Sequence, residues 1–345
     1  MRASIAILSW NAARMIRRAA QSALEQTHPD VDVIVLDNGS TDGTVDLLPA
    51  LEGLGCRIVR SSTNLGYAEG MNAAYRASEG DVFVAMNCDA VLHPEFVANA
   101  VKLLDDRPEV GIVGALVYRL EGHDSPWHAT PASRPPIDGF VVGLGPTMRT
   151  RLVAGPSHTA SSFKANGACP VLRRSAVEQI HAAYGTGPFD PVFDTYGEDV
   201  DLAFKAWALG WETVASAAVV AAHERSYGTA PRVYDRRGRL RVNSIAARHL
   251  NAWRHLPMSM LPGTVTLLIA GDMGLTARQL IRGEADIVRD VGRAWARVWR
   301  NRRDLRRFRR LHPPPSPRLV RARMQARHPS VSLVAEADRF GKTTR

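Results

Sequence analysis

Four short stretches of this chain carry carboxylate and amide side chains in an order that suits a charged nucleotide and its metal. They are residues 36–44, 64–67, 87–89 and 197–202. Each of the first three follows an apolar run of strand length. We therefore expect them at the carboxyl ends of neighbouring strands, where open α/β sheets keep their ligand crevice.

The first stretch places Asp37 at the end of the apolar run 31–36. A carboxylate at a strand end can accept hydrogen bonds from a base or a ribose, and Gly39 lets the turn approach a ligand closely. A helix-entry role for Asp37 is the structural alternative. Further polar groups of this loop and of the second stretch are expected to face the nucleotide, and they are Asn38, Asn64, Gly66 and Asn72.

A phosphate-binding glycine loop is excluded, because the chain has neither GxxxxGK[ST] nor a GxGxxG after its first strand. A divalent metal would then have to neutralise a diphosphate, and Asp89 is a hard oxygen ligand of the kind that Mg²⁺ or Mn²⁺ prefers. Asn87 is a neutral substitute for a first carboxylate, whereas the thiol of Cys88 suits packing better than such ions. A turn role would be the better interpretation of a lone aspartate, but the upstream stretches favour the metal.

The fourth stretch places three carboxylates before the amphipathic run 203–210, at a helix N-terminus where the helix dipole favours their ionised form. We expect Asp199 to act as a general base that deprotonates an attacking hydroxyl. Glu198 would orient acceptor hydroxyls or Asp199, and Asp201 would mainly cap the helix. Plain helix-start chemistry is the alternative for all three. His223 ends a further apolar run, like a strand-end ligand for metal or phosphate.

Hydrophobic periodicity supplies the elements that must position these residues. The pattern alternates strands and helices over 3–8, 12–26, 31–36, 41–46, 56–59, 70–77 and 81–86. Sequential βα units predict right-handed crossovers and an α/β fold with a mostly parallel sheet and helices on both faces. A helix over 94–104 and a strand over 111–118 follow. The stretch 121–156 is then an acceptor loop or lid, or a poorly ordered segment.

Length and composition are those of a globular protein. The chain has 345 residues, 45% of them hydrophobic, enough for one large domain or two ordinary ones. Its three scattered cysteines do not suit a disulfide framework or a zinc site, which favours a reducing cytosolic compartment. The run 5–10 is unlike a signal peptide, and 258–271 is shorter than the roughly 18–20 residues that span a bilayer, so no transmembrane helix is predicted.

Charge divides the chain sharply. Residues 1–225 carry a net charge of −8 and residues 226–345 carry +18, which together give the chain's +10. An acidic body with a basic tail suggests that the catalytic part and the docking part are separate.

The densest arginines lie over 289–327, interleaved with Trp295, Trp299 and Phe308, until prolines at 313–315 break the helical pattern. Such a helix would lie on an anionic membrane surface at the inner face of the plasma membrane. A solvated helix or a disordered tail is the alternative. Nucleic-acid binding ranks third and is not expected, because no zinc-finger, RRM or KH pattern accompanies the charge.

Taken together, the motifs resemble the inverting GT-A glycosyltransferases of family 2, and within them the bacterial rhamnosyltransferase-like branch. The matching segments are 9–11, 37–44, 64–72, 87–89, 166–168 and 198–201, with His223. Their joint order is specific for the family and covers roughly residues 3–225. The C-terminal region matches only loosely the membrane-peripheral helices often attached to such enzymes.

The resemblance implies a role for each matching residue. Asp37 would hold the nucleotide base or ribose, in a nucleotide-sugar site that includes Ser9 and Asn11. Asp89 would hold the metal, with His223 as a further metal or phosphate contact, and Asp199 would be the general base. The family's usual Asp-X-Asp is here Asn-Cys-Asp, which leaves one carboxylate for Mg²⁺ or Mn²⁺.

The implied reaction moves a sugar from a nucleotide-sugar donor to a hydroxyl with inversion of configuration. The resemblance suggests dTDP-rhamnose as donor, with UDP-sugars or GDP-mannose as alternatives, and the basic C-terminal region suggests a cell-envelope glycan or lipid-linked acceptor. A nucleotidyltransferase would show a glycine-rich basic loop after the first strand, which residues 9–13 lack. An inactive GT-A-like binding module is the other alternative, disfavoured by the intact acidic motifs.

We divide the chain accordingly. Residues 1–225 are the expected catalytic domain, with a nucleotide-sugar half over about 1–118 and an acceptor half over about 157–225. Residues 226–345 are an expected basic, mainly helical region with a poorly ordered tail after about 312.

Overall fold

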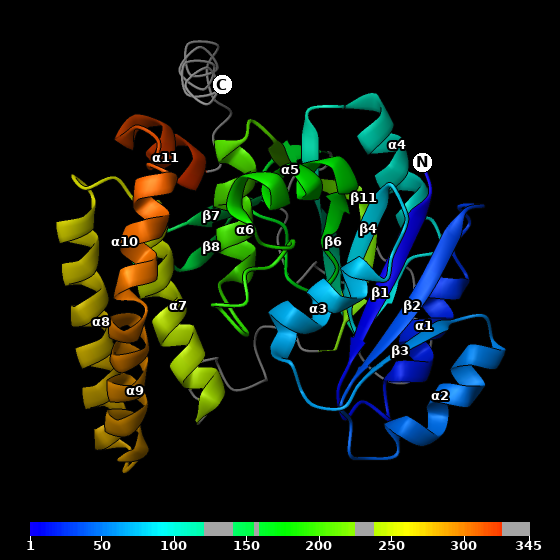
Figure 1. Cartoon of the computed structure of the whole chain (residues 1–345), viewed down its shortest axis with the longest axis horizontal. Helices are drawn as coiled ribbons and strands as arrows, with labels where there is room; N and C mark the ends of the chain where they lie inside the picture. Colours follow the sequence, from blue (N-terminus) through cyan, green and yellow to red (C-terminus); the bar gives the residue numbers. More distant parts are fainter. Residues whose placement is uncertain (121–140, 155–158, 225–237, 326–345) are drawn as a thin grey trace.

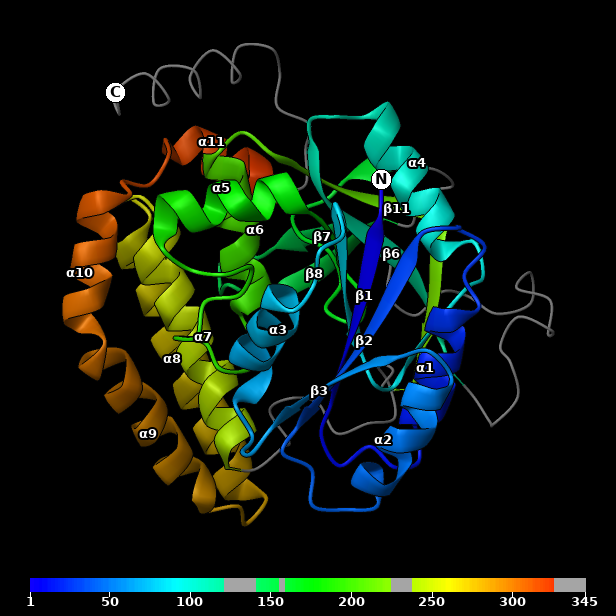
Figure 2. The ribbon, with the colours of Figure 1, turned by 45° about the vertical axis from the view of Figure 1, so that its right-hand side comes forward.

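The computed structural model describes residues 1–120, 141–154, 159–224 and 238–325. A twisted central sheet carries helices on both faces, and a group of C-terminal helices packs beside it (Figures 1 and 2). In the described part of the chain, the sheet has nine strands in the order β3-β2-β1-β4-β10-β6-β11-β5, with β9 paired to β11. The expected α/β class is therefore confirmed.

The N-terminal half alternates strands and helices as the periodicity predicts. Its elements are β1 (Ala3–Ser9), α1 (Ile16–Leu24), β2 (Val31–Asn38), α2 (Thr44–Gly53), β3 (Arg57–Ser61), α3 (Gly66–Arg76) and β4 (Val82–Asn87). The strands pair in parallel, β1 with β2 and β4, and β2 with β3. Strands β2 and β4 lie on opposite sides of β1, because the chain first moves outward through β2 to β3 and then returns to β4. Such a reversal is where open α/β sheets bind ligands.

The second half of the sheet is mixed. Its elements are β5 (Ala90–Leu92), α4 (Phe96–Asp106), β6 (Val110–Arg119), β9 (Ala160–Ser161), β10 (Val171–Arg173), α5 (Arg174–Tyr184), α6 (Glu198–Ala208) and β11 (Glu212–His223). β6 and β11 pair in parallel, whereas β5, β9 and β10 run antiparallel to their neighbours. A separate hairpin of β7 (Val141–Leu144) and β8 (Thr150–Ala154) occupies part of the stretch that we expected to be irregular. Residues 121–140 and 155–158 of that stretch lie outside the described residues.

Side chains alternate across the sheet and build one core on each face. Ile5 and Ile7 of β1 pack with α1, α2 and α4, whereas Ala6 and Leu8 pack with α3, α5 and α6. The sheet is therefore buried on both faces, and the parallel pairing of β1 with β2 and β4 places the loops after these strands at one end of the sheet.

Two helix starts differ from the sequence expectation. α1 begins at Ile16 rather than near residue 12. The backbone amides of residues 11–13 donate instead to the side chains of Ser40, Asp42 and Thr44, which hold this loop to the loop after β2. α3 begins at Gly66 rather than Gly70, directly after an Asx turn in which Asn64 Oδ1 accepts from the Gly66 amide at 2.8 Å.

The C-terminal region is a helical layer packed against α6. It contains α7 (Arg239–His255), α8 (Leu261–Ile281), α9 (Asp286–Arg300), α10 (Arg302–Leu311) and α11 (Pro317–Met324). The expectation of a poorly ordered tail after about residue 312 is wrong up to residue 325, because Val320 and Met324 of α11 are buried with Phe204 and Trp207 of α6. Residues 326–345 lie outside the described part of the chain. No helix among the described residues is long and apolar enough to cross a bilayer.

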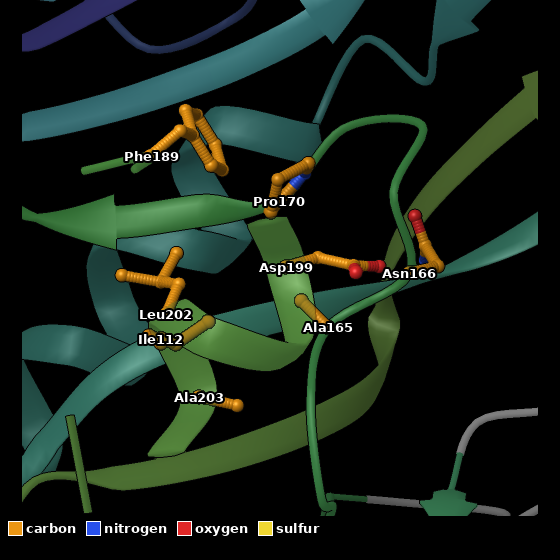
Figure 3. Close-up of a pocket in the computed structure, with 8 residues that line it drawn as sticks. All are labelled: Ile112, Ala165, Asn166, Pro170, Phe189, Asp199, Leu202 and Ala203. Atoms are coloured by element: carbon orange, nitrogen blue, oxygen red, sulfur yellow. The ribbon is translucent and has the colours of Figure 1, made fainter. Parts of the chain in front are cut away.

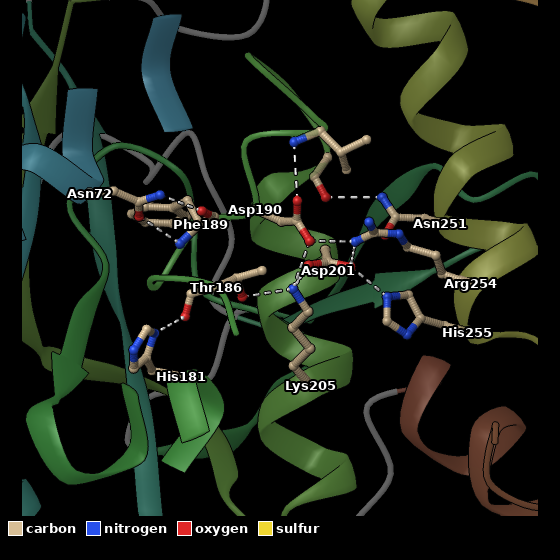
Figure 4. A network of polar contacts seen from close by, with 12 residues as sticks. Asn72, His181, Thr186, Phe189, Asp190, Asp201, Lys205, Asn251, Arg254 and His255 are labelled. Atoms are coloured by element: carbon tan, nitrogen blue, oxygen red, sulfur yellow. Dashed lines mark hydrogen bonds and ion pairs between the residues drawn. The ribbon is translucent and has the colours of Figure 1, made fainter. Parts of the chain in front are cut away.

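A buried ion network joins α6 to α7, as Figure 4 shows. Asp201 is 1% exposed and contacts Lys205 Nζ at 2.6 Å, Arg254 Nη1 at 3.1 Å and His255 Nε2 at 2.7 Å. Asp190 binds Lys205 and Arg254 as well. Burial opposes ionisation of Asp201, but these cationic partners together hold its pKa far below the ordinary value. The helix-capping role expected for Asp201 is therefore wrong, because its carboxylate turns into the protein.

We expect Asp201→Asn to lower the free energy of unfolding by about 3 kcal/mol, since it leaves the buried Lys205 and Arg254 with a single carboxylate, that of Asp190. Urea denaturation at neutral pH would measure the loss. Asp46→Asn is the matched control, because Asp46 lies in the first turn of α2 and is exposed. A loss no larger than that of the control would show that the network does not stabilise the fold.

Candidate functional site

Asp89 and His223 lie side by side at one end of the sheet, although 134 positions separate them. Asp89 follows β4, and His223 is the last residue of β11, which pairs with β5 so that His223 faces Ala90. Asp89 Oδ1 lies 2.9 Å from His223 Nε2, and the Glu224 amide donates to the Asp89 carbonyl. The fold thus unites the two residues expected at a metal.

This pair suits a divalent cation that has further ligands from elsewhere. A carboxylate oxygen and an imidazole nitrogen are both ordinary ligands of Mn²⁺ and related ions. Across residues 1–120, 141–154, 159–224 and 238–325, no three His, Cys, Asp or Glu side chains group as a closed metal site. Phosphate oxygens and water complete many such sites, so two protein ligands are enough.

The segment 166–168 connects the end of β4 to the acidic motif. The Asn87 amide donates to the Ala168 carbonyl at 2.9 Å, and Asn166 Nδ2 donates to the Ala115 carbonyl of β6 at 2.6 Å. A Cβ placed on Gly167 would lie 3.8 Å from Asp199 Oδ2. One short segment therefore contacts both the strand that precedes Asp89 and the carboxylate of Asp199.

Asp199 stands in the first turn of α6, facing a small hollow beside Ala165 and Asn166 (Figure 3). The helix begins after Gly197, whose φ of +88° favours glycine. Asp199 Oδ2 accepts from Lys164 Nζ at 2.5 Å, and Oδ1 accepts from the Val200 amide. Its side chain is 24% exposed, and a carboxylate with one partner on each oxygen retains capacity to accept another hydrogen bond.

Glu198 differs from its neighbour in both burial and charge. Its side chain is buried, and among the described residues its Oε2 has no hydrogen-bond partner. Burial, together with the negative charge of Asp199, raises the pKa of Glu198 to about 8. At neutral pH Glu198 is therefore mainly a neutral acid that can donate a hydrogen bond.

Three residues expected in the nucleotide site lie at the ends of β1 and β2. Ser9 and Asp37 are register neighbours, and both are buried. Asp37 Oδ1 accepts from the Ser40 amide at 3.2 Å, whereas Ser9 Oγ has no hydrogen-bond partner among the described residues. Asn11 adopts a φ of +49° and accepts from the Thr41 amide at 2.8 Å, so it ties the two loops together.

The side chain of Asn38 forms hydrogen bonds within the protein instead of facing a ligand site. It is 2% exposed, donates to the Gly66 carbonyl at 3.1 Å and accepts from the Leu65 amide at 2.9 Å. Asn64 receives a further hydrogen bond from Asn38 Nδ2. These contacts fix the loop before α3 against the end of β2.

Asn72 is likewise used within the protein, against our expectation of a ligand contact. It is 2% exposed, and its amide group donates to and accepts from the backbone of Phe189, at 2.6 and 3.1 Å. Figure 4 shows this clamp beside the ion network. Asn72 thereby positions the segment that leads into the acidic motif.

Lys164 is a site residue that sequence reasoning missed. It lies two positions before the segment 166–168, and its 8% exposed side chain reaches Asp199 and the Ala165 carbonyl. A lysine in an unclassified loop gives no periodic or motif signal, so only its closeness to the sequence NGA could have drawn attention to it.

Sequence comparison places this geometry among known proteins. The model of "Glycosyl transferase family 2" matches residues 4–179. An uncharacterized glycosyltransferase of a Nostoc species is 29% identical over 126 residues, which cover 36% of this chain and 39% of that one. The matches cover 23% and 35% of the next two relatives, so the chain aligns with well under two thirds of each.

A longer match comes from Mycobacterium tuberculosis. Its N-acetylglucosaminyl-diphospho-decaprenol L-rhamnosyltransferase is 26% identical over 286 residues, which cover 74% of this chain and 85% of the relative.

Solved structures share the fold at low identity. GalNAc-T7, solved with UDP, GalNAc and Mn²⁺, superposes with a TM-score of 0.57 at 14% identity, over 72% of this chain and 48% of that one. A mannosyltransferase from Pyrobaculum calidifontis, solved with GDP-mannose and Mn²⁺, gives 0.52 at 18% identity, over 86% and 87%. The family match spans more than half of the chain, and the sheet is that of GT-A glycosyltransferases, as expected. This chain therefore belongs to glycosyl transferase family 2.

Proposed function

We propose that the chain is an inverting, metal-dependent glycosyltransferase that moves a sugar from a nucleotide-sugar donor to a hydroxyl of a cell-envelope glycan or a lipid-linked acceptor. The proposed donor is dTDP-rhamnose. Support for rhamnose comes from the mycobacterial relative, whose name specifies an L-rhamnosyltransferase acting on a diphospho-decaprenol. The proposed site is cytoplasmic, at the inner face of the plasma membrane.

The segment 166–168, which lies between the two acidic motifs, carries this proposal. The backbone amide of Asn87 donates to the Ala168 carbonyl, and a Cβ on the adjacent Gly167 would lie 3.8 Å from Asp199 Oδ2. The residues proposed for the metal and for the base thus lie close to one short segment. A displacement reaction needs its leaving-group site and its base on either side of one reacting carbon.

The nucleotide-sugar half, about residues 1–118, would bind the donor at the reversal of the sheet. Asp37 would accept from the base or ribose, and Ser9 Oγ, which is buried without a partner among the described residues, would gain one. Asp89 and His223 would hold Mg²⁺ or Mn²⁺. When bound, the cation would supply charge neutralisation for the departing diphosphate.

Asp199 is the proposed base of the acceptor half, about residues 157–225. It would take the proton of the acceptor hydroxyl while that oxygen bonds to the anomeric carbon and the bond from this carbon to the diphosphate breaks. One displacement inverts the configuration. Glu198 is a poorer base at neutral pH, because with a pKa of about 8 it already holds a proton. It would instead donate a hydrogen bond to a sugar hydroxyl.

Other donors have support from the solved structures. GalNAc-T7 was solved with UDP, and the Pyrobaculum enzyme was solved with GDP-mannose. A thermal-shift screen of nucleotide sugars with Mn²⁺ would rank dTDP-rhamnose against these donors, and a larger shift with a UDP- or GDP-sugar would replace rhamnose in the proposal.

We expect Asp199→Asn to lower the rate of sugar transfer by about 10²-fold or more, because the amide cannot accept the proton. Donor binding, measured by calorimetry, should stay within a few-fold of wild type. Asp46→Asn, the same change in the first turn of α2, should leave both unchanged. Loss of binding and transfer together would assign Asp199 to donor binding or folding.

Metal removal provides a second prediction. Excess chelator should suppress transfer, and added Mn²⁺ should restore it, if the leaving diphosphate needs a cation. His223→Gln should raise the Mn²⁺ concentration for half-maximal rate by about 10-fold, as loss of a ligand commonly does. A full rate in excess chelator would contradict the metal assignment.

Glu198 makes a prediction about stability and pH. In the unfolded chain its pKa is near 4.5, and in the fold it is about 8. Between these values the unfolded state binds fewer protons, so the glutamate destabilises the fold as pH rises. Glu198→Gln cannot ionise, and its stability relative to wild type should increase from pH 5 to pH 8, by on the order of 1–3 kcal/mol.

Urea denaturation at both pH values would measure this difference. Glu52→Gln makes the same change on an exposed position of α2 and reports the effect of losing an exposed carboxylate. An equal pH dependence for both variants would mean that Glu198 is not held protonated by its surroundings.

A further inference from the structure

Helix α8 is apolar on its outer side as well as on its inner side. Its buried residues are Leu261, Leu268 and Leu275, together with the polar Thr264, Asp272 and Gln279. Its exposed residues include large apolar side chains, which are Leu267 (45% exposed), Ile269 (43%), Met273 (57%), Leu280 (46%) and Ile281 (87%). We call these five residues the α8 face. A soluble surface helix normally turns its apolar stripe inward.

Buried contacts of Asp272 fix this orientation. Its carboxylate is 0% exposed and accepts from Arg248 at 2.7 Å, His249 Nε2 at 2.8 Å and Trp295 Nε1 at 2.9 Å. Turning the helix to bury the α8 face would expel this carboxylate from its partners. Separating a buried carboxylate from its arginine and histidine partners is strongly unfavourable, so the apolar side chains stay outside.

Helix α8 lies at the outer edge of the molecule, on the side away from the sheet (Figure 1). In the described part of the chain, α8 packs mainly against α7 and α9. Ile269, Met273 and Leu280 recur at spacings of four and seven residues, so these exposed side chains form one apolar stripe along the outer side of α8. A contiguous apolar surface of this kind marks an interaction site.

Charged residues beside the face indicate its partner. Arg278 and Arg282 are exposed at the C-terminal end of α8. The acidic residue of α8, Asp272, is buried. We propose that the α8 face lies in the interfacial layer of an anionic lipid bilayer, with its apolar side chains among the acyl chains and its arginines at the headgroups.

A second copy of the chain fits this surface less well. A symmetric pair would use the same patch on both copies, and this patch offers the arginines no exposed acidic side chain of α8, because Asp272 is buried. An anionic lipid surface instead complements them. The contact differs from a helix lying on the membrane over residues 289–327, because Phe308 in that range stacks on Tyr184 inside the protein.

The proposal rests on the surface of α8 and not on the proposed reaction, so vesicle binding can be tested whether or not transfer is detected. The full chain should co-sediment with vesicles of phosphatidylcholine and phosphatidylglycerol, and much less with phosphatidylcholine alone. The triple variant Leu267→Gln, Met273→Gln and Leu280→Gln should lower the partition coefficient more than about 10-fold, because it removes three apolar side chains from the contact.

Two controls make the result of the vesicle experiment interpretable. Leu54→Gln changes a leucine that is 51% exposed at the end of α2, and it should leave vesicle binding unchanged. Far-ultraviolet circular dichroism should show that the triple variant is folded, as expected for exposed positions.

Unchanged vesicle binding by the folded triple variant would overturn the proposal. So would sedimentation velocity that shows, without vesicles, a dimer lost in the triple variant, because the face would then be an interface between copies. Binding to neutral vesicles as strong as to anionic ones would reject the anionic surface as the partner.

Discussion

The buried carboxylate of Asp201 is the contact on which the position of the acidic motif depends. It follows Asp199 by two residues on the first turns of α6, and its partners Arg254 and His255 come from α7. Burying a carboxylate costs several kcal/mol unless its partners are complete. The C-terminal helices therefore do more than extend the catalytic domain, because they supply the arginine and the histidine that bind this carboxylate and allow α6 to begin in this orientation.

A series of fixed contacts extends from this network toward the first strands. Asp190, which binds Arg254, follows Phe189, and the backbone of Phe189 is clamped by Asn72 of α3. The loop before α3 is held in turn by Asn38 at the end of β2. The loops at this end of the sheet and the acidic motif are thus held in place before any ligand arrives. Less conformational entropy is then lost when a ligand binds.

Local patterns predicted the parts of the molecule that local physics determines. The alternating strands and helices up to β4 follow from apolar runs and helical periodicity, and the pairing of Asp89 with His223 follows from both ending strands of one sheet. The contacts of Lys164 and Arg254 could not be predicted, because each depends on a partner 35 or more positions away with no spacing signal. Asn72 was misassigned for the same reason, since its partner, the backbone of Phe189, carries no side-chain signature.

The division of charge along the chain also did not reveal which distant residues contact one another. The acidic body and the basic tail suggested separate catalytic and docking parts. In the structure, however, several of their opposite charges form ion pairs between the two parts. Arg239 and Arg254 form ion pairs with Asp194 and Asp190, each at 2.7 Å. Both pairs lie just before the acidic motif, where Arg297 also donates to the backbone carbonyl of Val192 at 2.7 Å. Opposite charges in the two parts therefore stabilise one interface between them. The exposed apolar side chains of α8 lie outside this interface.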